Sequence, residues 1–145
     1  MPTSSTSRIC IAGAITGLII VLGEVVLNGL VLVDEWNTVN ASLGLPLPSP
    51  LISTLVLLKL FALGFLIQWL YWAIQPRFGR GRKTALIAGG IVALIVWAWA
   101  LSGLYMAGYV NPHIAWVTLV WGSIEVPMAA VLGVMFLERR PAEGK

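Results

Sequence analysis

Residues 19–36 read I-I-V-L-G-E-V-V-L-N-G-L-V-L-V-D-E-W, which places a carboxylate and a carboxamide inside an apolar run long enough to cross a bilayer. Glu24 and Asn28 are four residues apart, so on a helix they lie on one face. The same face continues through Gly17 and Gly13 in one direction and to Glu35 in the other. A carboxylate at the bilayer centre costs about 2.5–3.5 kcal/mol even on lenient insertion scales. Glu24 is therefore expected to face a protein partner or a water-filled cavity.

The composition predicts an integral membrane protein. Of 145 residues, 59% are hydrophobic and 10% are charged, whereas soluble domains carry about 25% charged residues. The net charge of +3 does not indicate a nucleic-acid partner, because the basic residues follow membrane topology and do not gather on one face. Membrane lipids are the expected partners, with no nucleic acid.

Four spans are predicted in one domain of residues 1–145, at residues 9–33, 51–75, 84–109 and 113–137. Residues 34–50 contain two acids and three prolines and are predicted to form an exposed loop. Pro76 is predicted to end the second span, and Asn111-Pro112 to form the next turn. Short connections favour neighbours that run in opposite directions. The expected fold class is all-α integral membrane, an antiparallel up-down four-helix transmembrane bundle.

The distribution of basic residues predicts the orientation. Eight of the nine Lys and Arg residues lie near the amino terminus, between the second and third spans, or in the carboxyl-terminal tail. The other two loops carry Asp34, Glu35 and His113 but no Lys or Arg. By the positive-inside rule, both termini and the basic loop are expected on the cytoplasmic side. That basic loop should bind anionic lipid headgroups through Arg77, Arg80, Arg82 and Lys83.

Three charged residues are predicted to lie at similar depth in three different spans. With a rise of about 1.5 Å per residue, Glu24, Lys59 and Glu125 lie about 14, 12 and 18 Å below the outer boundary. Left unpaired, they would cost about 8–10 kcal/mol of insertion, so they are expected to meet inside the bundle, with Asn28 beside them. Because two carboxylates would share one ammonium, one carboxyl is expected to hold its proton.

Two readings of this cluster stay open. Buried ion pairs also serve as structural contacts that fix helix register, whereas ionisable residues inside a membrane commonly mark proton or ion handling. Glu24 is the expected proton-exchanging acid, because Asn28 extends a polar route outward on the same face. Gln68 is about 180° round the helix from Lys59, so it should point away from the cluster, and Lys59→Ala should destabilise more than Gln68→Ala.

Recognisable catalytic constellations are absent from the sequence, and no enzyme activity or cofactor is expected. His113 is the single histidine, which excludes a histidine-rich metal site and bis-histidine haem ligation within one chain. The glycines of G-R-G-R-K lack the spacing of a phosphate-binding loop.

Three segments carry a family resemblance. They are E-V-V-L-N-G through E-W, then W-L-Y-W-A-I-Q-P-R-F-G-R-G-R-K-T-A-L-I-A-G, then V-W-G-S-I-E-V-P-M-A-A-V-L-G. Together they resemble a widespread set of small bacterial four-span membrane proteins to which no function is assigned. The resemblance implies a bacterial inner-membrane location and carries no substrate or site residue.

The leading hypothesis is a small membrane protein that binds a proton or cation through Glu24, Lys59 and Glu125. Four spans leave little room for an enclosed path, so transport would require a homo-oligomer. The main alternative is a non-catalytic accessory subunit of a larger membrane complex, and a lipid-acting enzyme is third.

Overall fold

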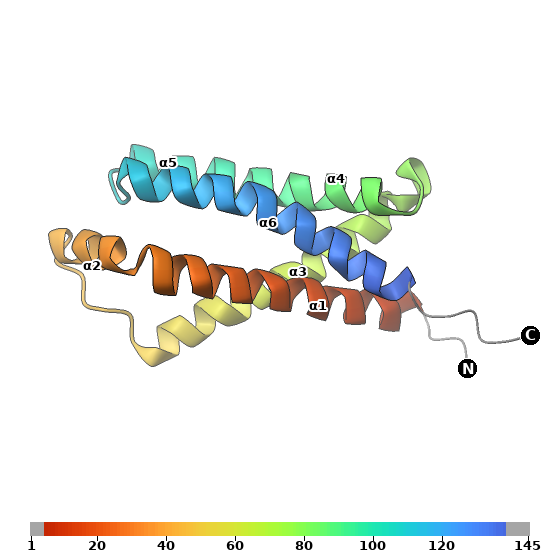
Figure 1. Cartoon of the computed structure of the whole chain (residues 1–145), viewed down its shortest axis with the longest axis horizontal. Helices are drawn as coiled ribbons and strands as arrows, with labels where there is room; N and C mark the ends of the chain where they lie inside the picture. Colours follow the sequence, from red (N-terminus) through yellow and green to blue (C-terminus); the bar gives the residue numbers. More distant parts are fainter. Residues whose placement is uncertain (1–4, 139–145) are drawn as a thin grey trace, which may run out of the picture.

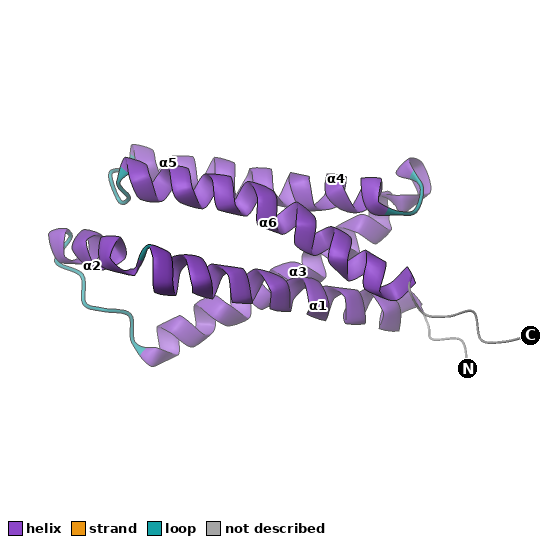
Figure 2. Ribbon diagram, in the orientation of Figure 1, coloured by secondary structure: helices purple, strands orange, loops and turns teal. Residues whose placement is uncertain are grey.

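The computed structural model describes residues 5–138 of the 145-residue chain. The basic tail residues Arg139, Arg140 and Lys145 lie outside this range. The described part is helical, with short connections and no strand (Figure 2). Its elements in chain order are α1 (Ser5–Val26), η1 (Leu27–Val31), α2 (Val33–Ser42), α3 (Pro50–Phe78), α4 (Arg82–Ala93), η2 (Leu94–Ala100), α5 (Leu101–Met106) and α6 (Pro112–Glu138), where η marks a π-helix.

The expectation of four long apolar helices is confirmed. Four stretches are long and apolar enough to cross a membrane: Thr6–Val31, Pro50–Phe78, Arg82–Met106 and Pro112–Phe136. The start of α1, the end of α6 and the α3–α4 connection lie at one end of the molecule, and α2 and the α5–α6 connection lie at the other (Figure 1).

Two predicted boundaries are wrong. The segment 34–50 is not a loop throughout, because α2 occupies Val33–Ser42. Its first turn holds Asp34 and Glu35, which complement the helix dipole, and Trp36 and Val39 pack on a core cluster. Pro76 does not end the second span either, because α3 continues through it to Phe78. The helix stops at Gly79, whose φ of 81° few other residues adopt.

Glycines set the closest helix crossing. A Cβ at Gly64 of α3 would overlap the backbone of Gly13 and Gly17 on α1, so the two helices touch there through their main chains. The G-x-x-x-G spacing of α1 thus serves a contact within the chain.

Helix α6 packs between α1 and α4. The larger core cluster includes Ile20 from α1, Val92 from α4 and Ala129 from α6. A second cluster at the α2 end includes Leu27 and Ile114. The first third of α3, residues 50–59, is exposed throughout and extends away from α4, α5 and α6 (Figure 1).

Candidate functional site

The Glu24 carboxylate is buried on α1 and accepts hydrogen bonds from two side chains. Its exposed fraction is 8%. Asn28 Nδ2 donates to Glu24 Oε2 over 2.7 Å, and Trp97 Nε1 donates to Glu24 Oε1 over 3.3 Å. The same Asn28 amide also donates to the Glu24 main-chain carbonyl over 3.1 Å. Both carboxylate oxygens are therefore held by N–H donors.

The orientation of the Asn28 amide follows from its neighbours. Trp36 Nε1 can only donate, and it lies 2.9 Å from Asn28 Oδ1. The Asn28 nitrogen must then face the Glu24 carboxylate. The hydrogen bonds run from Trp36 through Asn28 to Glu24, and Trp97 donates from the other side. The N–H groups of Asn28 and Trp97 both point at the Glu24 carboxylate, an arrangement that suits an anion.

Two π-helical segments supply the donors. Asn28 lies in η1, and Trp97 lies in η2. Each π turn widens the helix and shifts the side chains that follow onto a new face, and such turns are frequent at functional sites. A notch on α6 admits the Trp97 indole, because a Cβ at Gly122 would overlap it. The site therefore depends on irregular backbone that hydropathy does not reveal.

The Glu125 side chain extends from α6 to α1 and contacts it at Gly23, the residue before Glu24. A Cβ at Gly23 would overlap the Glu125 carboxylate, so that carboxylate lies against bare α1 backbone. Glu125 Oε2 is buried and has no hydrogen-bond partner. The same holds for Thr118 Oγ1 and Trp121 Nε1, which lie on the same face of α6 at spacings of three and four residues. The structure thus places the two acids together and leaves three polar atoms unpaired along this face of α6, one of them on Glu125 itself.

Lys59 does not join the acids, and the expectation of a Glu-Lys-Glu cluster is wrong. Lys59 is exposed, and the one ion pair within residues 5–138 joins His113 and Glu35. Depth along a span does not determine direction around the helix. The face of α3 that enters the bundle carries Gln68, about 180° from Lys59.

Gln68 forms a second polar contact inside the bundle. Its exposed fraction is 2%, and its Nε2 donates to Thr16 Oγ1 over 2.8 Å and to the Ala130 carbonyl over 3.0 Å. Thr16 Oγ1 in turn donates to the Ala129 carbonyl over 3.3 Å. Gln68 therefore bonds to two other helices of the same chain, and nothing in the sequence singles out Thr16 as its partner.

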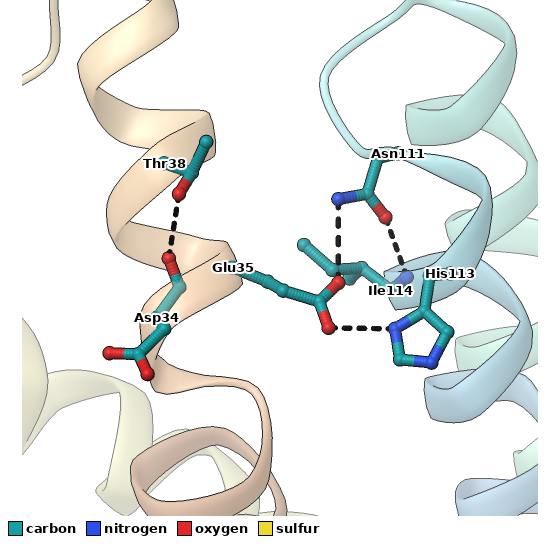
Figure 3. Close-up of polar contacts among 6 residues, drawn as sticks. All are labelled: Asp34, Glu35, Thr38, Asn111, His113 and Ile114. Carbon is teal, nitrogen blue, oxygen red and sulfur yellow. Dashed lines mark hydrogen bonds and ion pairs between the residues drawn. The ribbon is translucent and has the colours of Figure 1, made fainter.

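Glu35, Asn111 and His113 form a third set of polar contacts, between α2 and the start of α6 (Figure 3). Glu35 Oε1 is 2.7 Å from His113 Nδ1, and Asn111 Nδ2 lies 3.5 Å from Glu35 Oε2. Asn111 also caps α6 by accepting the Ile114 N–H over 2.8 Å, with Pro112 at the first helical position. Because Trp36 follows Glu35, this group and the Glu24 network share helix α2.

The predicted headgroup-binding residues Arg77, Arg80, Arg82 and Lys83 are all exposed around the α3–α4 connection. The connection itself is held by side chains, because Thr84 Oγ1 donates to the Gly79 carbonyl over 2.7 Å.

An apolar groove is lined in part by Trp97. It has a volume of about 190 Å³ and lies between α5 and the first half of α6. Its lining includes Leu101, Tyr105, Trp116 and Leu119. Neither Glu24 nor Glu125 lines this groove.

Within residues 5–138, no three His, Cys, Asp or Glu side chains are grouped to hold a metal ion. The acid pair itself offers two carboxylates, and Glu125 Oε2 is buried without a hydrogen-bond partner. This donor set suits a proton or a single monovalent cation.

Comparison with known proteins gives no relative. No family model matches the chain, and no curated protein or solved structure matches it.

Proposed function

We propose that this chain is a small proton-binding membrane protein whose Glu24 and Glu125 side chains share one proton between α1 and α6. The observation that supports this is the contact between two acids, Glu24 buried and Glu125 half-buried, with no basic side chain paired to either among the described residues. Two adjacent carboxylates cannot both remain charged in a dry site. A bound proton, or less readily a monovalent cation, neutralises one of them.

The hydrogen bonds assign the roles. Glu24 accepts from Asn28 and Trp97, which favours its ionised form, whereas Glu125 Oε2 has no donor. Glu125 is accordingly the proposed proton carrier and Glu24 the fixed anion. This assignment reverses the expectation from sequence, which treated Asn28 as part of a route and not as a donor that holds Glu24.

Infrared difference spectroscopy across a pH titration tests the proposal. The purified protein in vesicles should show the carbonyl stretch of a protonated carboxylic acid. Glu125→Gln should remove that band, and Glu24→Gln should shift it. Ser123→Ala, on the same helix, is the matched control and should retain the band. Absence of any protonated carboxyl band over the titration would refute the proposal. Stabilisation by Na⁺ or K⁺ that Glu125→Gln abolishes would show that a cation occupies the site.

The chain is further proposed to be a bacterial inner-membrane protein with four antiparallel spans and both termini in the cytoplasm. The exposed cluster at Arg77, Arg80, Arg82 and Lys83 supports this orientation and a contact with anionic headgroups. Reporter fusions at Lys145 and Asn40 should report opposite compartments. The same compartment for both would exclude this topology.

A second candidate function, a subunit of a larger membrane complex, is favoured by the exposed Lys59 on α3. The two functions are compatible, because the acid pair and Lys59 lie on different faces of the bundle.

A further inference from the structure

One face of α3 carries a stripe with the spacing of a helix-packing seam. Its members are three and four residues apart in alternation, which is the a/d pattern of a heptad repeat. All are exposed, and the large apolar ones are about half exposed. The stripe consists of Ile52, Leu55, Lys59, Ala62, Leu66 and Trp69.

Lys59 is the single charged member of this stripe. It lies nine residues from the start of α3, or about 14 Å along the helix, which places it deep in a bilayer of ordinary thickness. An ammonium at that depth is costly unless it has a partner. The helix cannot rotate to bring Lys59 inside, because Gln68 on the opposite face is locked to Thr16 and to the Ala130 carbonyl.

From this geometry we infer that the α3 stripe binds a transmembrane helix of another protein, and that this helix presents an Asp or Glu to Lys59. Charge complementarity selects the partner, because an intramembrane carboxylate forms a hydrogen-bonded ion pair with the lysine. A polar residue at one a position also fixes the register of packed helices. Ala62 lets the partner backbone approach one turn further along.

A second copy of this chain does not fit the stripe. In a two-fold dimer about the membrane normal, the same patches meet, so Lys59 would face Lys59 of the other copy. The acids of this chain within the spans are also unsuitable, because Glu24 is buried and Glu125 lies against α1 at Gly23. The partner is therefore a different protein.

This inference deepens the subunit function and is independent of the proton site, which the infrared titration tests separately. The experiment uses the full chain labelled with a donor dye at its single cysteine, the exposed Cys10, in lipid vesicles. The probe is a synthetic leucine-rich single-span helix with an acceptor dye and one Asp at the depth of Lys59. Matched probes carry Asn or Leu at that position. Energy transfer measures association.

The Asp helix should associate about tenfold more strongly than the Leu helix, as expected for a hydrogen-bonded pair within a membrane. Lys59→Met should reduce its association to the level of the Leu helix, and Lys59→Glu should favour a Lys-bearing helix instead. Leu55→Trp, within the stripe, should weaken binding, and Leu86→Trp on α4 should not. Equal association of the Asp and Leu helices, or no effect of Lys59→Met, would overturn the inference and leave Lys59 extended toward the headgroups.

Discussion

Replacement of Gln68 should destabilise the protein more than replacement of Lys59, the reverse of the order expected from charge alone. Gln68→Ala removes two inter-helix hydrogen bonds, each worth about 0.6–1.7 kcal/mol in a membrane protein. It also leaves a cavity at a site whose exposed fraction is 2%. The expected loss in the free energy of unfolding is about 3 kcal/mol. Lys59→Ala removes an exposed, unpaired cation and should change stability by less than about 0.5 kcal/mol.

The measurement is reversible unfolding by denaturing detergent in mixed micelles, followed by circular dichroism. Gln68→Met keeps most of the side-chain volume and separates the two contributions, with an expected loss of about 1–2 kcal/mol. A double-mutant cycle of Gln68→Met with Thr16→Val should give a coupling energy of about 1 kcal/mol, because the two side chains share a hydrogen bond of 2.8 Å. A larger loss from Lys59→Ala than from Gln68→Ala would refute the packing described for α3. Additive losses in the cycle would refute the Gln68 contact.

Two further substitutions probe the acid site in the same unfolding assay. Gly23→Ala should destabilise by about 1 kcal/mol, because the new methyl group displaces the carboxylate at the end of the flexible Glu125 side chain. Gly90→Ala, where a Cβ meets no atom within 4 Å, should be neutral or stabilising. Trp97→Phe should destabilise by about 1–2 kcal/mol through loss of the N–H donated to Glu24, and Trp99→Phe, at a position 81% exposed, should have no measurable effect. Equal effects within either pair would contradict the corresponding contact.

The long helices were predictable because span length and hydropathy are properties of the sequence alone. The residues at which these helices begin and end were harder to predict. The acids and prolines of residues 34–50 together predict a loop, but the prolines begin only at Pro46, so the residues before them are free to form α2. The spacing of Trp36 and Val39, three residues apart, was the available sign of a helix with one packed face.

The candidate site was predictable in part. The spacing of Glu24 and Asn28 predicted one helix face, and the two side chains do hydrogen-bond. Trp97 could not be selected from the sequence, because its contact with Glu24 depends on a π-helical segment that no residue pattern predicts. For Lys59, the position along the helix does not determine the direction in which the side chain points around it.

The outward direction of Lys59 was nevertheless implied by a second residue of the same helix, Gln68. Lys59 and Gln68 lie on opposite faces of one helix, so only one of them can enter the bundle. Burying the neutral amide satisfies its hydrogen bonds with Thr16 and a main-chain carbonyl, whereas burying the ammonium beside two carboxylates would require desolvation of three charges. Because Gln68 is the residue that enters the bundle, the charged side chains are separated. Glu24 and Glu125 remain inside without a cation, and Lys59 remains outside without an acid. The proposed proton on Glu24 and Glu125 and the proposed acidic helix beside Lys59 would each supply a counter-charge that residues 5–138 do not.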